Sequence, residues 1–131
     1  MSSAPAMKEF VCILPDKPGA QAKRLEVRPS HLENAKALTA AGSIVAGGAL
    51  LESHPAEGEA PVFKGSMMMV VAEDEAAVRA LLEKDIYARE GVWDLEKAQV
   101  YPVFLSLLPP ALEAQLRLQR GFVMDANGNG V

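Results

Sequence analysis

A histidine occupies an inward position in the first expected helix. His31 lies four residues before Ala35 and seven before Leu38, a spacing that places the three side chains on one face of a helix. Imidazole is the side chain whose charge changes most readily near neutral pH. His31 is therefore a candidate for moving a proton inside the protein.

An aspartate occupies the corresponding position in the second expected helix. Asp85 lies four residues after Leu81 and seven after Val78, so it continues the apolar stripe of that helix. It also stands at the expected end of the helix, where the helix dipole disfavours negative charge. Both features make the carboxylate costly unless it has a partner.

We expect His31 and Asp85 to meet, because antiparallel helices would bring the start of one beside the end of the other. A carboxylate bonded to a histidine fixes the tautomer and stabilises the imidazolium, which suits general acid and base catalysis. The alternative is structural, because a buried pair of this kind can simply tie two helix ends together.

Other polar and aromatic residues are candidates for the same pocket. Arg24 and Arg28 are either solvated surface charges or face the pocket and hold an anionic or phenolate group; the second alternative is favoured for Arg28, which borders the expected helix cap. Ser66 either donates a hydrogen bond into the pocket or only begins a strand. Tyr87 and Trp93 offer apolar faces with a polar handle, which suits a flat, small cyclic or phenolic ligand.

The elements that must position these residues follow the order strand, helix, strand, strand, helix, strand. Ser30 and Glu33 match a capping box that would begin the first helix, and Gly42 would end it. Pro102 lacks a ladder donor, which places the last strand at a sheet edge. Strands are expected at 9–14, 43–51, 66–72 and 98–105, and helices at 30–41 and 75–85 after a cap at Asp74.

Three long loops are expected at the end of the molecule where His31 and Asp85 meet. They cover about 15–28, 52–65 and 87–97. Functional residues gather on such loops, so their position agrees with a pocket at this end. The second histidine, His54, is expected to be a loop residue only.

The simplest arrangement of these elements is a ferredoxin-like α+β sandwich, with both helices on one face of a four-stranded antiparallel sheet. The runs "FVCIL" and "SMMMVVA" are apolar on both faces, although the helices can cover only one. The other face would be a large exposed apolar patch. We therefore expect a homodimer whose sheets face each other as an α/β barrel.

Composition excludes several classes of function. The 131 residues fit one domain. Thirteen basic and seventeen acidic residues give a net charge of -4, with no basic stripe, so nucleic acid is not an expected partner. No long apolar run precedes Phe10, so we expect no secretory signal and no membrane anchor, and we expect a cytoplasmic protein.

The sequence contains no pattern for a metal or a cofactor. Cys12 is the only cysteine and lies within an apolar run, so we expect it to pack in the core. The two histidines are far apart, which disfavours a metal site. The segment "DANGNG" matches the first half of a calcium-binding loop but lacks the bidentate glutamate, so calcium is not expected.

The chain divides into three parts. Residues 1–8 are expected to be a flexible N-terminus, and 9–105 to form the domain. Residues 106–131 are expected to form an extension with a short helix at about 110–120, after two prolines, and a mobile tail.

Three stretches of the chain carry a family likeness: "ILPDKPGAQAKRLEVRPSHLENAKAL", "GGALLE" and "KGSMMMVVAEDEAAVRALLEKDIYAREGVWDLEKAQVYPV". Together they resemble the YciI-like (YCII-related domain) proteins, especially the longer fungal members, over about 9–104. The most specific parts are the Arg-Pro-x-His helix start and the Asp-x-Tyr segment followed by Gly-Val-Trp. Bacterial members often have Asp-Pro-Tyr where this chain has Asp85, Ile86 and Tyr87, a departure that keeps the aspartate and the tyrosine.

The resemblance implies a dimeric α/β barrel with an active site built on a His and Asp pair, which maps onto His31 and Asp85. Related proteins include a dehydrochlorinase acting on a chlorinated hydroxyquinol. The wider superfamily contains cofactor-free isomerases, lyases and monooxygenases for small aromatic or lactone substrates. We therefore expect a small cofactor-independent lyase or isomerase, or alternatively a non-catalytic dimeric module that binds a small molecule in the same pocket.

Overall fold

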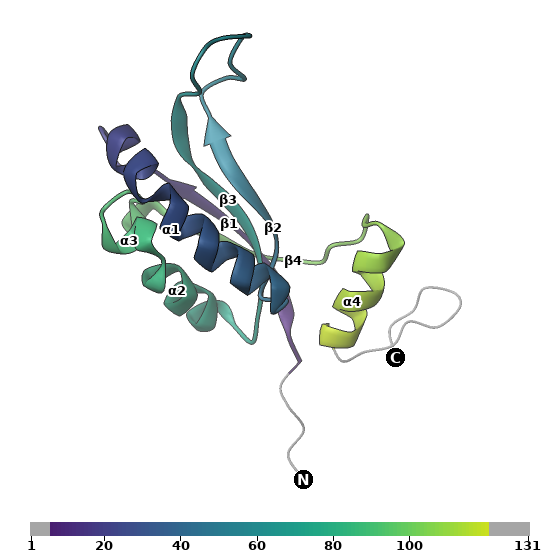
Figure 1. The fold of residues 1–131 in the computed structure, drawn as a ribbon. Helices are drawn as coiled ribbons and strands as arrows, with labels where there is room; N and C mark the ends of the chain where they lie inside the picture. The colour runs from purple at the N-terminus through teal and green to yellow at the C-terminus, as the bar shows by residue number, and fades with distance from the viewer. Residues whose placement is uncertain (1–5, 121–131) are drawn as a thin grey trace.

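The computed structural model describes residues 6–120 and shows an α+β sandwich (Figure 1). Its elements are β1 (Lys8–Pro15), α1 (Gln21–Ala40), β2 (Ile44–Leu51), β3 (Phe63–Ala72), α2 (Glu75–Lys84), α3 (Ile86–Arg89), the 3-10 helix η1 (Leu95–Lys97), β4 (Gln99–Val103) and α4 (Pro110–Arg120). The mobile tail and the "DANGNG" segment of the sequence analysis lie outside the described residues.

The four strands form one antiparallel sheet in the order β2-β3-β1-β4. Figure 1 shows α1 and α2 together on one face of this sheet. The arrangement is the ferredoxin-like α+β sandwich that the sequence predicts. Pro102 lies in β4, which is an edge strand as predicted.

The core lies between the sheet and the two helices. Phe10, Cys12 and Leu14 alternate along β1 and are buried on its helix-facing side. Val78 and Leu82 of α2 are buried in the same core. Burial raises the pKa of the Cys12 thiol to about 11, although Arg79 opposes the shift, so Cys12 stays a neutral, packed side chain.

The first helix begins earlier than the sequence predicts. Ser30 is exposed inside α1, and the residue at the N-cap position is Ala20, which provides no side-chain cap. The expected capping box of Ser30 and Glu33 is therefore wrong, and most of the expected loop at 15–28 is helical. Pro29 lies inside the helix, where proline costs about 3 kcal/mol relative to alanine.

Contacts with distant segments stabilise the first turns of α1 and explain this difference. The Gln21 side chain donates to the Pro61 carbonyl and accepts from the Phe63 backbone N–H, both at 3.0 Å. One turn later, Arg24 forms a buried ion pair with Asp16. None of these partners lies within one helical turn of the helix start, so a capping pattern could not reveal them.

The end of α1 agrees with the sequence. Gly42 has a φ of +85°, and its N–H donates to the Thr39 carbonyl while the Ser43 N–H donates to the Leu38 carbonyl. This left-handed residue ends the helix as predicted, because glycine adopts a positive φ without steric cost.

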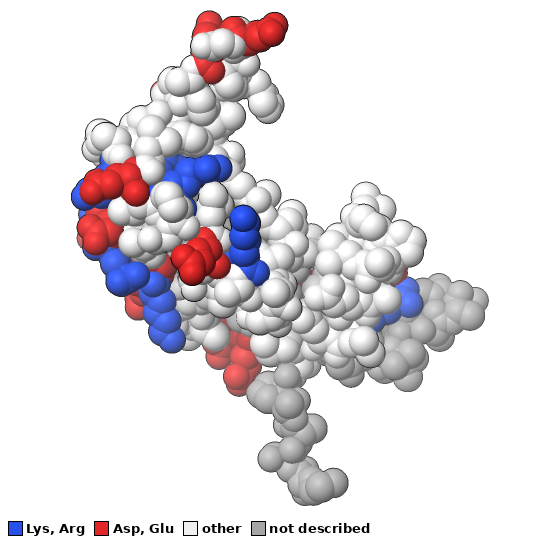
Figure 2. All heavy atoms as spheres, viewed as in Figure 1, with Lys and Arg blue, Asp and Glu red and all other residues white. Residues whose placement is uncertain are grey.

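The β2–β3 hairpin extends beyond the rest of the sheet (Figure 1). β3 begins at Phe63 rather than at Ser66, because its first residues pair with Leu50 and Leu51 of β2. Acidic side chains gather at the hairpin tip (Figure 2), and His54 is exposed in the same segment.

The face of the sheet opposite α1 and α2 is apolar. Val11 and Ile13 of β1 lie beside Met69 and Met67 of β3, and all four are partly buried. Tyr101 of β4 is opposite Val11 and is 51% exposed.

The last helix attaches near one end of this outer face. In Figure 1, α4 lies on the far side of the sheet from α1 and α2. The Gln119 carbonyl accepts from the Met7 N–H at 3.0 Å, and the Gln119 side chain donates to the Gly42 carbonyl at 3.3 Å. Within residues 6–120, no helix is long and apolar enough to span a membrane.

The two expected helix caps should differ in their effect on stability. Asp74 accepts from the Ala77 N–H at 2.8 Å, so Asp74→Ala should lower the free energy of unfolding by about 1 kcal/mol. Ser30→Ala should change it by less than about 0.5 kcal/mol, because Ser30 caps nothing. Urea denaturation of both variants measures the difference, and equal losses would contradict the observed helix start.

Candidate functional site

His31 and Asp85 form the hydrogen-bonded pair that the sequence predicts. The His31 Nδ1 lies 2.8 Å from Asp85 Oδ1 and 3.0 Å from Oδ2. The imidazole is 12% exposed and the carboxylate 4%. The pair is therefore largely shielded from solvent, with the histidine as the more accessible member.

Asp85 lies at the break between two helices rather than inside α2. Its backbone is extended, and it follows the last residue of α2, Lys84. It also caps the start of α3, where its side chain accepts from the Tyr87 N–H at 2.9 Å. This bond offsets the unfavourable dipole at the end of α2, and the prediction of a last inward helical position is corrected accordingly.

The pair fixes the tautomer of His31. A carboxylate only accepts hydrogen bonds, so Nδ1 carries a proton, and in the neutral imidazole Nε2 carries the lone pair. Nε2 makes no hydrogen bond with any residue that the structure describes. His31 lies in the middle of α1. The backbone groups at the ends of the helix are therefore too far away to bond to the imidazole, and the Asp85 carboxylate is its partner.

Two aromatic rings hold the imidazole in place. The Tyr87 ring stacks on His31 with centroids 3.9 Å apart and planes 12° apart. Trp93 meets both rings edge-on, at 5.9 Å from His31 and 5.5 Å from Tyr87. Tyr87 and Trp93 are each only 1% exposed, so their rings pack mainly against protein, and their role as walls for a flat ligand stays a prediction.

Arg24 is at the centre of a second buried network. Its Nη1 lies 2.8 and 3.0 Å from the two carboxylate oxygens of Asp16, and its Nη2 donates to Ser66 Oγ at 2.8 Å. The guanidinium also lies over the rings of Tyr87 and Phe63. Arg24 is therefore buried, and the solvated alternative is wrong.

Asp16 is a site residue that the sequence analysis missed. Burial raises the pKa of its carboxyl above the usual value, and Arg24 opposes this shift. Asp16 directly follows β1, and its backbone pairs with Trp93 across the end of the sheet. An acidic residue right after a buried strand was the available signal, but it points to Arg24 only once α1 is known to begin at Gln21.

A cavity of about 280 Å³ lies between α1 and the strands β2 and β3. Gly47 and Gly48 contribute no side chain to it, which leaves room beside the helix. Apolar groups form the rest of the wall. The polar side chains that line it are Arg24, Arg28, His31, Thr39, Ser66 and Tyr87.

The cavity therefore brings together most of the predicted site residues. Arg28, His31, Ser66 and Tyr87 face one space from three different elements. Asp85 stands behind His31. Trp93 does not line the cavity but donates its indole N–H to Ser66 Oγ at 3.1 Å, so it supports the wall from behind.

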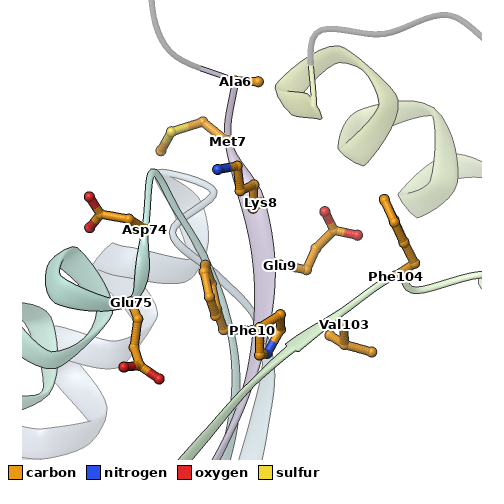
Figure 3. A pocket seen from close by; sticks show the side chains of 10 residues that line it. Ala6, Met7, Lys8, Glu9, Phe10, Asp74, Glu75, Val103 and Phe104 are labelled. Atoms are coloured by element: carbon orange, nitrogen blue, oxygen red, sulfur yellow. The ribbon is translucent and has the colours of Figure 1, made fainter. Parts of the chain in front are cut away.

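A larger hollow of about 680 Å³ lies near the opposite end of the sandwich (Figure 3). It is lined by the start of β1, the start of α2 and the end of β4, including Glu9, Phe10, Asp74 and Phe104. No histidine, serine or tyrosine lines it. Because the His31 pair is absent there, the smaller cavity is the candidate site. No group of three metal-ligating side chains occurs among residues 6–120.

Comparison with known proteins identifies the family. The profile of the YCII-related domain matches residues 8–103. The chain belongs to the YCII-related domain family. Fusaric acid biosynthesis protein 2 of Gibberella fujikuroi is 36% identical to it over 99 residues, which cover 76% of this chain and 95% of that protein.

Two further similarities extend this result. The "derivative of benzaldehyde biosynthesis cluster protein C" of Emericella nidulans is 44% identical over 69 residues, which cover 52% of this YCII-related chain and 70% of that protein. A solved structure of 5-chloro-2-hydroxyhydroquinone dehydrochlorinase from Burkholderia phenoliruptrix, in complex with 2,5-dihydroxybenzoquinone, superposes with a TM-score of 0.64. It covers 75% of this chain and 95% of its own at 22% identity, which shows a shared fold.

The ion pair between Asp16 and Arg24 should be strongly coupled. Asp16→Asn and Arg24→Gln should each lower the free energy of unfolding by about 3–5 kcal/mol, because each leaves a buried charge without its partner. The double variant should lose clearly less than the sum. Urea denaturation of the four proteins gives the coupling energy.

The exposed pair between Glu113 and Arg117 is the matched control. Its N–O distance is 2.7 Å, but its side chains are 40% and 46% exposed. The same cycle on this pair should give a coupling of only about 0.5 kcal/mol. An equally small coupling for Asp16 and Arg24 would show that the buried pair does not organise the site.

Proposed function

We propose that the cavity is the active site of a small enzyme that moves a proton on a small cyclic or phenolic compound, as a lyase or isomerase. His31 is the acid and base, and Asp85 orients it. One observation supports this proposal above the others: Asp85 binds Nδ1, while Nε2 keeps a lone pair without a partner at the cavity.

The proposed step begins when Nε2 takes a proton from a carbon or hydroxyl group of the substrate. The electron pair of the broken bond moves into the ring system and onto an oxygen, and the imidazolium is stabilised by Asp85. In a lyase, the electron pair then expels a leaving group such as chloride. In an isomerase, His31 returns the proton at another atom.

The comparisons agree with a substrate of this class. The structural neighbour is named for action on a chlorinated hydroxyhydroquinone and holds a dihydroxybenzoquinone, and one relative is named for a cluster that makes a benzaldehyde derivative. These names concern single-ring oxygenated compounds. A cavity of about 280 Å³ has the size for a ligand of one ring.

Proton transfer can be tested without knowledge of the natural substrate. The protein would be incubated with 5-chloro-2-hydroxyhydroquinone without oxygen, to follow chloride release, and with a panel of dihydroxyphenols and cyclic diketones in D₂O, to follow deuterium uptake at carbon by NMR. His31→Asn should abolish turnover. Asp85→Asn should lower kcat by about 10²–10⁴-fold, because the imidazole loses its orienting carboxylate.

His54→Asn is the control, because His54 is exposed on the hairpin; it should retain full activity. A large loss of Tm in both His31→Asn and Asp85→Asn would instead favour a structural tie. Tight binding of a panel compound that is always recovered unchanged would favour a non-catalytic binding module.

We also propose that two copies of the chain pair through the outer face of the sheet. Support comes from the apolar side chains Val11, Ile13, Met67 and Met69 on a face that α1 and α2 do not cover. Burial of this patch against a second copy would remove it from water.

Sedimentation velocity at micromolar concentration should therefore show a dimer. Met69→Lys should shift the protein toward the monomer, because it places a charge in the proposed interface, whereas Leu25→Lys on the half-exposed surface of α1 should not. A wild-type monomer at these concentrations would rule out the pairing.

A further inference from the structure

The hydroxyl of Ser66 has one hydrogen-bonding function left. Its oxygen accepts from Arg24 Nη2 at 2.8 Å and from Trp93 Nε1 at 3.1 Å. Arginine and tryptophan can only donate, so both lone pairs of the serine oxygen are used. The hydroxyl proton has no acceptor among the residues that the structure describes, and Ser66 lines the cavity. Ser66 can therefore act on a ligand only as a donor.

The hydroxyl of Tyr87 is also unused. Its ring is covered by the His31 imidazole and the Arg24 guanidinium, and the residue is 1% exposed. Its phenolic oxygen makes no hydrogen bond within residues 6–120. Among the described residues, Gln119 Oε1 is the only fully buried side-chain nitrogen or oxygen without a partner, so the Tyr87 hydroxyl is not sealed by protein, and Tyr87 lines the cavity. The hydroxyl is therefore free to bond to a ligand there.

The charges around the cavity favour a negative ligand. Arg28 lines the cavity and forms no ion pair with the described part of the chain. The nearby carboxylates of Asp16 and Asp85 are bound to Arg24 and His31, and no acidic residue lines the cavity. Arg28 therefore contributes a positive charge that no protein group neutralises there.

We propose that Ser66, Tyr87 and Arg28 together bind an ionised oxygen of the substrate, a phenolate, enolate or carboxylate. The proposal rests on the proposed function and deepens it. His31 Nε2 accepts a proton at the same cavity while the two hydroxyls and the guanidinium receive the negative charge that the oxygen gains. Preorganised donors of this kind stabilise developing charge because they need no reorientation during the reaction.

Arg24 and Trp93 act as positioning residues for this subsite. Their N–H groups fix the Ser66 oxygen, so its remaining proton has one direction left. Arg24 also lies over the Tyr87 ring, with its guanidinium carbon 4.7 Å from the centroid. The Ser66 hydroxyl and the Tyr87 ring are thus held against the same buried guanidinium.

The protonation of Tyr87 agrees with a donor role. Burial raises the pKa of its hydroxyl above the ordinary value, and the nearby Arg24 and Arg28 oppose the shift. Tyr87 therefore keeps its proton at neutral pH and can donate it in a hydrogen bond.

The test uses 4-nitrophenol, whose ionisation is visible in its absorption spectrum, and its neutral analogue 4-nitroanisole. The wild-type protein should bind the phenol more tightly than the anisole and should lower the pH at which the bound phenol ionises. Tyr87→Phe and Arg28→Gln should each move this pH back up by about one unit, equivalent to a tenfold loss of preference for the phenolate. Tyr87→Phe should keep its Tm, because the lost hydroxyl has no internal partner.

Tyr101→Phe is the matched control, because Tyr101 lies on β4 and does not line the cavity; the ionisation of the bound phenol should be unchanged. Ser66→Ala should also weaken the preference, but it leaves two buried donors without an acceptor and is interpreted only if its Tm is retained.

Three results would overturn the proposal. One is that neither 4-nitrophenol nor 2,5-dihydroxybenzoquinone binds at millimolar concentration. Another is that Tyr87→Phe and Arg28→Gln leave the ionisation of bound 4-nitrophenol unchanged. The third is that only His31→Asn removes the effect, which would assign the anion to an imidazolium. These binding measurements involve no turnover. The anion-binding proposal can therefore succeed or fail independently of the proposed reaction, and the two failures can be told apart.

Discussion

The buried guanidinium of Arg24 is the contact on which the candidate site depends. It joins Asp16 after β1, Ser66 in β3 and Tyr87 in α3 to the first turns of α1. A buried charge of this kind is tolerated only with good partners, and the guanidinium has enough donors to serve several at once. Together with the hydrogen bonds of Gln21, it holds the first turns of α1, Ser66 and the Tyr87 ring in one arrangement.

The His31 pair is built on this frame. Tyr87 stacks on the imidazole and lies against Arg24. One aromatic ring therefore contacts both the Asp16–Arg24 ion pair and the His31–Asp85 pair. Trp93 joins them again through Ser66 and through its edge contacts with both rings. The two aromatic side chains that the sequence suggests as a ligand surface therefore also form part of the scaffold that holds His31 and Ser66.

Periodicity was enough to predict the topology, because the apolar runs of β1 and β3 and the stripe of α2 reflect the burial of their residues. It also predicted the meeting of His31 and Asp85, since both break an inward stripe. The start of α1 could not be predicted, because Gln21 is held by a segment about 40 residues away and Arg24 by Asp16 and Ser66, outside any capping pattern. Ser30 and Glu33 supply a local pattern that caps nothing.

The packing of the Tyr87 and Trp93 rings could not be predicted for a similar reason. Residue type indicates that a tyrosine or tryptophan has a flat face, but only the packed structure shows what covers that face. Asp16 was missed because its partner lies in a stretch that the sequence suggests is a loop. In each case the decisive contact joins separate segments, which one sequence does not record.

Asp85 has a consequence for the precision of the site. The same oxygen, Oδ1, receives Nδ1 of His31 and the backbone N–H of Tyr87. The imidazole and the backbone of Tyr87 are therefore both bonded to one carboxylate oxygen. Only one residue, Ile86, separates Asp85 from Tyr87 along the chain. Because only two peptide units separate Asp85 from Tyr87, motion that shifts α3 carries the carboxylate and the tyrosine together, so the acceptor of the imidazole and the ring that stacks on it keep their positions relative to each other.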